Sequence, residues 1–445
     1  MTDASVDYHA LHARYVLTPW SAQAGLKPPV MVRGEGCFLY DMEGRRYLDF
    51  TAGLVAVNLG HGHPRVVQAI KMQAERLCYV PPSFFNDVRA ELAEMLIKMA
   101  PWAEGGRVFF TTGGAEANED AIKMARLITG RPKVLAAYRS YHGSTFGAGT
   151  LTGDDRRFAV EPGIPGVIHF FTPYPYRSPF FSSDPTEETR RALDHLEEVL
   201  KLEGPEHVAA VVLEPVVGTN GVIIYPNGYL EGVRRITERY HIMLIFDEVM
   251  TGFGRTGAAF AAQTFGVTPD MIVFAKGVTS AYVPLGGVLI RESFARHFDT
   301  NILWCGHTFS GHPLAVAAGL AAQEVYRDER LFERAREIEG WLRQGLGELS
   351  RRHEVVGEVR GIGAMFALEL VRDKASRAPL ASRYAGDPAL IRDFHATLLR
   401  RGVYAFGRHH ILLVAPPLTI TREEINLGVE AIDAALEELA LKVGT

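Results

Sequence analysis

Short apolar runs alternate with helical patterns over the central part of the chain, and this alternation constrains the fold more than any other feature of the sequence. The runs occupy 108–111, 134–138, 208–213, 242–246, 271–275 and 287–290. Strands separated by helices are typical of βαβ units and of a mostly parallel sheet. Because the runs are apolar almost without interruption, both faces of the sheet are expected to be covered by helices. The pattern therefore predicts a doubly wound α/β domain.

The segments on either side of this central part predict a second, smaller unit. Residues 36–50 have the pattern of strands joined by a tight turn. Near the other end of the chain, helical patterns are followed by short strands at 355–371 and 403–415. The predicted division of the chain is an N-terminal arm that contributes part of the small domain (1–60), a large domain (61–326) and a C-terminal small domain (327–445).

The composition excludes several classes of protein. A chain of 445 residues, with 47% hydrophobic and 22% charged residues, is ordinary for a globular protein with a large domain and a smaller companion. The formal charge of −5 comes with no long basic tract, which argues against a nucleic-acid partner. No stretch approaches the ~18 apolar residues of a membrane span. Because Cys37, Cys78 and Cys305 are too widely spaced for a disulfide framework, we expect a cytoplasmic protein.

Two of the charged residues that follow apolar runs point to a specific chemistry. The run 242–246 stops at Asp247, and the run 271–275 stops at Lys276. The carboxyl ends of strands in a doubly wound sheet line one crevice, so this acid and this amine are expected to face one ligand. A lysine amine forms a Schiff base with the aldehyde of pyridoxal phosphate, and a carboxylate beside the pyridine nitrogen keeps the ring an electron sink. The alternative is that each residue ends a strand and reaches solvent.

A phosphate seat is predicted at 111–118, where a strand end is followed by the glycine turn Gly113 and Gly114 and by the start of a helix. Free backbone N–H groups at a helix start favour an anion. The alternative is an ordinary turn between strand and helix, capped by Thr112.

Three other motifs are rejected. Residues 252–257 match the G-x-G-x-x-G dinucleotide pattern, but no clear helix follows them. The sequence contains no G-x-x-x-x-G-K-[ST] motif, so a nucleotide hydrolase is not expected. His61 and His63 have no further ligands at usable spacing, so we expect no metal site.

Taken together, these residues resemble the class III aminotransferases of the fold-type-I pyridoxal-phosphate enzymes, over nearly the whole chain. The motifs that carry the resemblance are 244–257, 269–270, 275–277, 113–117, 141–144, Glu214 with Pro215, 307–313 and 415–418. The resemblance implies a large domain with a mostly parallel seven-stranded sheet, covered by helices on both faces, and a smaller α+β domain. It also implies that pyridoxal phosphate is the cofactor and that Lys276 binds it.

The resemblance assigns further contacts to the cofactor. It implies that Tyr141 stacks on the cofactor ring, that Val249 packs against the opposite face and that Glu214 orders the polar edge; each could instead be structural. Thr308 resembles the threonine that reaches the phosphate of the neighbouring subunit, which implies a homodimer with shared active sites and leaves a tetramer open. The predicted cofactor site comprises Gly113, Gly114, Ala115, Tyr141, His142, Glu214, Asp247, Val249, Lys276 and Thr308.

Within the class, the chain looks most like the ω-amino acid or amine:pyruvate aminotransferases, including the taurine type. By position, the residues that would line the substrate pocket are Trp20, Leu54, Val55, Phe84, Phe85 and Tyr141. Arg408 lies where these enzymes often place an arginine that binds the carboxylate of the keto acid, with a solvent-facing arginine as the alternative. Two residues depart from the family pattern. Ala115 replaces a frequent hydroxyl residue at the phosphate, and Val55 replaces a frequent tryptophan, which should widen the pocket.

The resemblance implies a ping-pong reaction. A primary amine displaces Lys276 and gives its amino group to the cofactor, and pyruvate then accepts it. Lys276, Asp247 and Tyr141 are the expected catalytic residues, with the free amine of Lys276 moving the proton. A decarboxylase of the dialkylglycine type and an aminomutase share this fold and remain alternatives. A non-catalytic scaffold would have little need for Lys276, Asp247 and Thr308 together.

Overall fold

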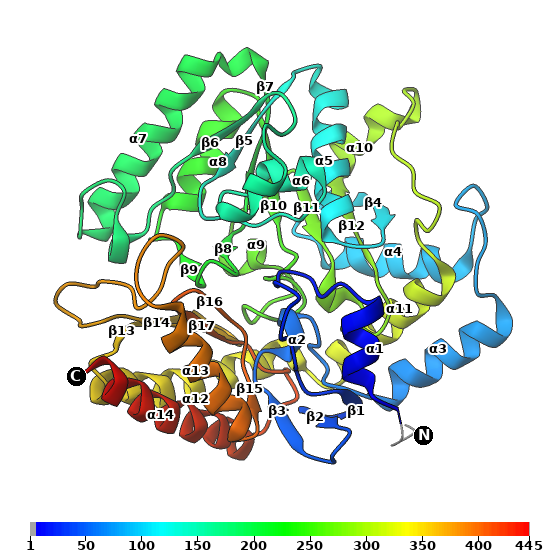
Figure 1. Ribbon diagram of the computed structural model, residues 1–445. Helices are drawn as coiled ribbons and strands as arrows, with labels where there is room; N and C mark the ends of the chain where they lie inside the picture. The colour runs from blue at the N-terminus through cyan, green and yellow to red at the C-terminus, as the bar shows by residue number, and fades with distance from the viewer. Residues whose placement is uncertain (1–5, 445) are drawn as a thin grey trace.

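The computed structural model describes residues 6–444 and has a seven-stranded sheet at its centre (Figure 1). In spatial order its strands are β4 (Gly106–Thr111), β12 (Gly286–Arg291), β11 (Met271–Phe274), β10 (Met243–Asp247), β7 (Val208–Leu213), β5 (Lys133–Ala137) and β6 (Val167–Phe170). β12 is antiparallel to both of its neighbours, whereas the other pairs are parallel. The prediction of a mostly parallel sheet is confirmed.

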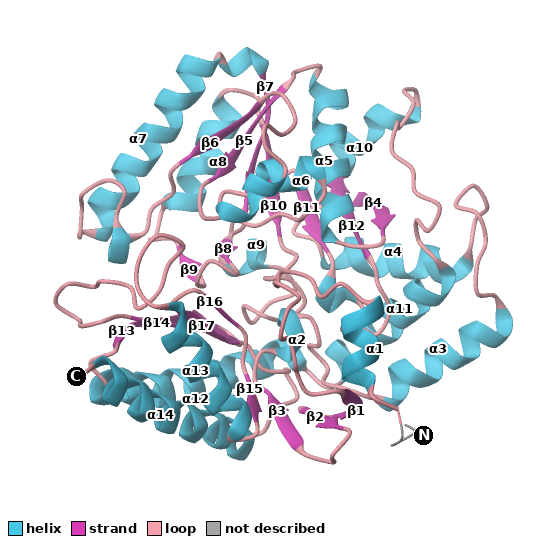
Figure 2. Cartoon of the chain, in the orientation of Figure 1, coloured by secondary structure: helices cyan, strands magenta, loops and turns pink. Residues whose placement is uncertain are grey.

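Helices cover both faces of this sheet, as predicted (Figure 2). Leu244 and Phe246 of β10 lie in one core cluster with residues of α8 (Tyr229–Arg239). Met243 and Ile245 of the same strand lie in another cluster with residues of α5 (Gly114–Thr129). Because successive side chains of a strand point to opposite faces, each face of β10 is packed against its own helix.

The strand β6 is not among the predicted runs. It lies at the edge of the sheet and pairs with β5, and three of its four residues are only partly buried. A strand at an edge is covered less completely than a central strand, so its apolar pattern is weaker, and His169 interrupts it.

The N-terminal and C-terminal segments form the rest of the molecule together. Strands β1 (Met31–Glu35), β2 (Phe38–Asp41) and β3 (Arg46–Asp49) make an antiparallel sheet that β15 (Val403–Tyr404) extends in parallel to β3. A second antiparallel sheet has the order β13 (Val356–Ile362), β14 (Met365–Leu370), β17 (Ile411–Val414) and β16 (Gly407–Arg408). The blue and orange elements lie together below the seven-stranded sheet in Figure 1. The boundaries at 60 and 326 stay predictions, and 1–5 and 445 lie outside the described residues.

The remaining elements surround these sheets. The other helices are α1 (Tyr8–Tyr15), α2 (Ala52–Val55), α3 (Pro64–Arg76), α4 (Asp87–Met99), α6 (Phe146–Leu151), α7 (Pro185–Glu203), α9 (Ala261–Thr264), α10 (Glu292–Ala295), α11 (Pro313–Asp328), α12 (Leu331–Arg352), α13 (Pro388–Arg400) and α14 (Arg422–Val443). The short 3-10 helices are η1 (Asp155–Ala159), η2 (Pro175–Arg177), η3 (Pro205–His207), η4 (Lys276–Val278) and η5 (Arg296–Asp299). β8 (Val216–Val217) and β9 (Ile223–Ile224) form a two-stranded ribbon. Between residues 6 and 444, no helix combines the length and the hydropathy needed to cross a membrane.

A buried arginine, Arg255, joins segments of the chain that are far apart in the sequence. Arg255 is completely buried and donates hydrogen bonds to Asn58 Oδ1 at 2.6 and 3.0 Å. It also donates to the carbonyl oxygens of Pro416 at 2.6 Å, Ala415 at 3.2 Å and Ala364 at 3.4 Å. The glycine-rich segment 252–257 therefore has a structural role, in agreement with the rejection of a dinucleotide site.

Candidate active site

A cavity of about 340 Å³ opens at the carboxyl ends of β4, β10 and β11. Side chains and backbone from many parts of the large sheet line it: Ala56, Thr112, Gly113, Gly114, Ala115, Tyr141, His142, Gly143, Ser144, Glu214, Asp247, Val249, Met250, Ala275, Lys276, Thr279, Ala281, Val283, Pro284 and Leu285. Parallel strands direct their carboxyl ends to the same edge of a sheet, which is where doubly wound folds bind ligands. The topology thus brings Asp247 and Lys276 to one cavity, as the charges at the strand ends predict.

Asp247 is the last residue of β10 and is buried, with 3% of its surface exposed. Its carboxylate Oδ2 lies 2.7 Å from His142 Nδ1 and accepts a hydrogen bond from Asn118 Nδ2 at 2.8 Å. The backbone N–H of Val249 donates to Oδ1 at 3.0 Å. Three segments of the chain therefore hold this carboxylate in one orientation, and both of its oxygens have hydrogen-bond partners.

His142 supports Asp247 electrostatically as well as by its hydrogen bond. Burial lowers the pKa of the imidazole, but the hydrogen bond and the charge of Asp247 outweigh burial, so the pKa of His142 is raised above its ordinary value. The second ring nitrogen of His142, Nε2, is buried without a partner. The side chain thus serves the carboxylate and no other group among the described residues.

Lys276 begins η4, directly after β11, and its amine faces the cavity. Enclosure by protein lowers the pKa of the amine from 10.5 to about 8, because burial disfavours the charged form more than Asp247 and Glu214 favour it. Its backbone has φ 48°, in the left-handed region that non-glycine residues rarely adopt. Such strain occurs where the surrounding structure holds a functional side chain in a required direction.

Glu214 closes the polar side of the cavity. Its carboxylate accepts hydrogen bonds from the backbone N–H groups of Tyr141 and Gly218, both at 2.8 Å. Burial raises the pKa of Glu214 to about 7, and the charge of Asp247 adds to this effect. Glu214 therefore fixes the backbone of Tyr141 from a position where it can hold a proton near neutral pH.

The start of α5 also lines the cavity, through Gly113, Gly114 and Ala115. Its N-cap residue, Gly113, has no side chain that could occupy the N–H groups of the first turn. A Cβ atom on Gly114 would lie 2.8 Å from Val249 Cγ2, so the glycine lets Val249 pack directly against the helix start. An uncapped helix start that lines a cavity is suited to bind an anion such as a phosphate.

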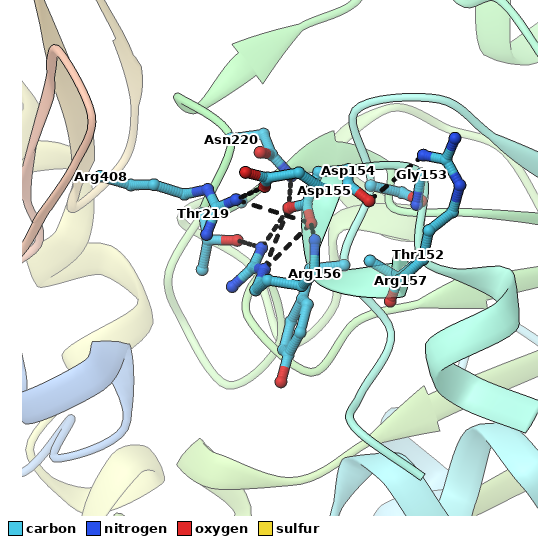
Figure 3. A network of polar contacts seen from close by, with 12 residues as sticks. Thr152, Gly153, Asp154, Asp155, Arg156, Arg157, Thr219, Asn220 and Arg408 are labelled. Atoms are coloured by element: carbon cyan, nitrogen blue, oxygen red, sulfur yellow. Dashed lines mark hydrogen bonds and ion pairs between the residues drawn. The ribbon is translucent and has the colours of Figure 1, made fainter. Parts of the chain in front are cut away.

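Tyr141 forms one wall of the cavity and is covered by an arginine. The guanidinium of Arg156 lies 3.7 Å from the centre of the Tyr141 ring, and Trp20 meets the same ring edge-on at a centroid distance of 6.3 Å. Arg156 donates hydrogen bonds to Asp154 at 2.5 Å and to Thr219 at 2.8 Å (Figure 3). A positive charge is thus fixed beside the cavity wall.

Several predicted site residues lie outside the cavity lining. Arg408 forms an ion pair with Asp155 and lies 3.7 Å from Asp154. Val55 is buried in a small core cluster with Met250, which itself lines the cavity. Those with exposed surfaces are Trp20, Leu54, Phe84, Phe85 and Thr308. Their predicted roles toward the substrate or the cofactor stay predictions.

Sequence reasoning missed two polar side chains that support the site, Asn118 and Arg156, as well as several lining residues: Ala56, Gly143, Ser144, Met250, Ala275, Thr279, Ala281, Val283, Pro284 and Leu285. Asn118 follows Gly114 by four positions, so both lie on the same face of α5, and this helical spacing is the signal that could have revealed it. Arg156 follows no strand end and belongs to no motif, so no local signal identifies it. In residues 6–444, no group of three or more His, Cys, Asp or Glu side chains is arranged to hold a metal ion.

The family of this chain follows from comparison with known proteins. The model of the family described as aminotransferase class-III matches residues 21–436. The chain is a class-III aminotransferase. A taurine:2-oxoglutarate aminotransferase from Bifidobacterium kashiwanohense, in complex with PLP and glutamate, superposes with a TM-score of 0.94 and 42% identity, over 98% of each chain.

Two further relatives of this aminotransferase are similar over almost their whole lengths. An (S)-enantioselective ω-transaminase from Thermomicrobium roseum has a TM-score of 0.92 and 39% identity, over 97% of this chain and 98% of that one. A probable γ-aminobutyrate transaminase from Oryza sativa subsp. japonica is 33% identical, over 98% of this chain and 94% of its own length. The fold-type-I architecture of the aminotransferase is therefore established together with its family.

Pyridoxal phosphate is the cofactor of this family, and the cavity is chemically suited to it. The cavity offers an amine of lowered pKa, a carboxylate held by His142 and Asn118, and an uncapped helix start for a phosphate. The amine, the carboxylate and the helix start match, in that order, the aldehyde, the ring nitrogen and the phosphate of the cofactor.

Proposed function

We propose that this aminotransferase is an ω-transaminase that moves an amino group from a primary amine or ω-amino acid to a keto acid, with pyruvate as the acceptor. The observation that carries the proposal is the position of Lys276 and Asp247 in one cavity, beside a wall made by Tyr141. The names of the relatives support an amine or ω-amino acid as donor. A ping-pong reaction is consistent with a single cavity that receives donor and acceptor in turn.

In this proposal Lys276 carries the cofactor and also moves the proton. When bound, pyridoxal phosphate supplies an electron sink for the donor carbon. The amine of Lys276, with its pKa near 8, takes the proton from that carbon and passes it to the cofactor. The second catalytic residue, Asp247, holds a charge at the pyridine nitrogen, and His142 and Asn118 keep it in place.

The other proposed contacts follow from the lining of the cavity. Tyr141, as the third catalytic residue, and Val249 would enclose the ring from two sides, and Glu214 would order the polar edge. Gly113, Gly114 and Ala115 would receive the phosphate through their backbone N–H groups. Ala115 has no hydroxyl group, so the backbone provides this part of the binding.

We also propose a homodimer in which each subunit completes the site of its partner. Thr308 and Phe85 are exposed in this chain, yet the sequence assigns them to the cofactor and substrate. Phe85 and Tyr79 lie in the same loop, between α3 and α4. This loop contacts the loop of Thr308, because Tyr79 donates a hydrogen bond to the carbonyl oxygen of Thr308 at 3.1 Å and the Tyr79 ring lies 6.1 Å from that of Phe309. In the proposed dimer, these two loops would reach the cavity of the partner subunit. A cytoplasmic location is proposed because the three cysteines are unpaired thiols.

A visible absorption spectrum with sequential substrates tests the proposed function. We expect the purified protein with pyridoxal phosphate to lose its visible band when a primary amine is added and to regain it with pyruvate. Recovery with 2-oxoglutarate in place of pyruvate would replace the proposed acceptor. Release of carbon dioxide, or an amino shift without a second substrate, would replace the transaminase reaction by decarboxylation or aminomutation. A protein that shows no band at any concentration of cofactor would refute the proposal.

A further inference from the structure

Two adjacent aspartates, Asp154 and Asp155, lie between the arginines Arg156 and Arg408 in the polar network of Figure 3. Asp154 binds Arg156, which covers the ring of Tyr141. Asp155 binds Arg408, whose guanidinium nitrogen is also 3.7 Å from Asp154. Arg408 is thus one aspartate away from an arginine that already touches the cavity wall.

The two aspartates differ in how completely they are bound. Asp154 has a side chain that is 9% exposed and accepts hydrogen bonds from Asn220 at 2.9 Å and from the backbone of Arg156 at 2.9 Å, besides its ion pair. Asp155 is 20% exposed and pairs with two arginines, Arg408 and Arg383 at 3.3 Å. The ring of His409 lies 3.7 Å away, and burial lowers the pKa of this imidazole. Asp154 is therefore fixed by several partners beside the arginine that covers Tyr141, whereas the ion pairs of Asp155 are with Arg408 and Arg383.

The backbone of Arg408 is fixed by strand pairing, so a different direction of its guanidinium would require rotation of the side chain alone. Its strand β16 is held to β17 by the pairing of Gly407 with Leu412 and of Arg408 with Ile411. The side chain is 17% exposed, so its ion pair with Asp155 is partly desolvated and stronger than a pair at an open surface. A carboxylate on a bound substrate offers the same planar partner as the carboxylate of Asp155.

We propose that Asp155 is a specificity-determining positioning residue. It holds Arg408 out of the cavity until the carboxylate of a keto acid replaces the carboxylate of Asp155 as the partner of Arg408. The proposal rests on the proposed function and on the role predicted for Arg408 by the family resemblance, which is to bind the carboxylate of the keto acid. While Arg408 is held by Asp155, the cavity mouth is free for the uncharged part of an amine. When a keto acid binds, its carboxylate competes with Asp155 for the same guanidinium.

The substitution Asp155→Asn tests this competition, because asparagine keeps the shape and removes the charge. Arg408 should then spend more time toward the cavity. The KM for pyruvate is expected to fall by ~3- to 10-fold, the range that corresponds to a partly exposed ion pair. The KM for an aromatic amine without an anionic group is expected to rise, because a charged side chain occupies its space. A merely structural defect would raise both values together.

Arg383→Gln is the matched control, since Arg383 competes with Arg408 for the same carboxylate. Removal of Arg383 leaves Asp155 bound to Arg408 at least as tightly, so the KM for pyruvate should stay unchanged or rise. In an Arg408→Ala background, Asp155→Asn should have no further effect on that KM. A crystal structure of Asp155→Asn without substrate should show Arg408 turned toward Tyr141.

The outcomes separate this inference from the proposed function. If Arg408→Ala raises the KM for pyruvate but Asp155→Asn leaves it unchanged or raises it, Asp155 is not the holding residue, while the proposed function stands. If Arg408→Ala leaves the KM unchanged, Arg408 does not bind the keto acid and the inference fails with that assignment. If the wild-type protein shows no spectral cycle with amine and keto acid, the proposed function itself fails.

Discussion

At the scale of single residues, the amine of Lys276 shows how burial prepares a group for chemistry. An ordinary lysine with a pKa of 10.5 is almost entirely charged at neutral pH and cannot attack an aldehyde. With its pKa lowered to about 8, about a tenth of the Lys276 amines are neutral at pH 7. The same enclosure that disfavours the charge therefore produces the nucleophile.

The pH dependence of cofactor uptake tests this lowered pKa. Because only the neutral amine reacts, the rate at which cofactor-free protein gains its visible band should rise about tenfold per pH unit below pH 8 and level off above it. Stopped-flow absorption between pH 6 and pH 10 measures this rate. A rate that keeps rising up to pH 10 would show an ordinary lysine.

Replacement of Lys276 tests its two proposed roles. In Lys276→Ala we expect turnover to fall by ~10⁴-fold or more, because both the covalent attachment and the proton carrier are lost. The exposed Lys98, which pairs with Glu94 on the surface, provides the control Lys98→Ala with unchanged turnover. A turnover rate of Lys276→Ala close to that of the wild type would contradict the catalytic role of Lys276, provided that circular dichroism shows both variants folded.

The charge of Asp247 can be removed while one of its two hydrogen-bond acceptors is kept. Asp247→Asn retains an acceptor for the side chain of Asn118 but removes the charge that the ring nitrogen requires. We expect kcat to fall by ~10²-fold or more while the protein still binds cofactor. Steady-state kinetics beside the surface control Asp299→Asn checks this, and a kcat within tenfold of wild type would contradict the role.

At the scale of elements, the start of α5 is built from two glycines with different requirements. Gly113 has extended backbone, with φ −175°, and a Cβ atom there would meet no heavy atom within 4 Å. A Cβ atom on Gly114 would press against Val249. Packing therefore requires glycine at the second position and tolerates a side chain at the first.

These two positions form a matched pair of variants. Gly114→Ala should lower the free energy of unfolding by about 1–3 kcal/mol, because Val249 must move away from the helix start. Gly113→Ala should leave stability almost unchanged. Thermal unfolding of the cofactor-free protein followed by circular dichroism measures both, and equal midpoints for the two variants would show that the packing of Val249 is not the cause.

At the scale of the whole molecule, Arg255 links segments that are far apart in the sequence. Its three nitrogens make five hydrogen bonds, to Asn58 and to carbonyl oxygens of the segments that follow β13 and β17. Without it, these acceptors would be buried without partners, each at a cost of about 1–3 kcal/mol. The arginine thus stabilises the packing of these segments against one another.

The contribution of Arg255 is measurable against an exposed arginine. Arg255→Met should destabilise the protein by at least about 3 kcal/mol, because several acceptors lose their donor at once. Arg65→Met removes a surface arginine that pairs with Asp328 and Glu324, and should cost less than about 1 kcal/mol. Urea unfolding compares the two, and similar losses in both variants would argue against a buried network.

Local pattern was enough to predict much of the fold and the centre of the site. The apolar runs that become β7, β10 and β11 are buried on both faces, so their composition alone indicates their place. The charges at Asp247 and Lys276 follow such runs directly, and strand ends of a parallel sheet converge by topology. The edge strand β6 escaped prediction because it lacks this complete burial.

Only the tertiary structure decided which distant side chains meet. The partners of Asp247, Asn118 and His142, come from other segments of the chain. Helical spacing can place Asn118 on the same face of α5 as Gly114, but it does not determine the hydrogen bond to Asp247. The pairing of Arg408 with Asp155 joins residues 253 positions apart. The physical reason is that burial acts on each segment separately and leaves a periodic pattern, whereas hydrogen bonds and ion pairs depend on how packed segments are placed relative to one another.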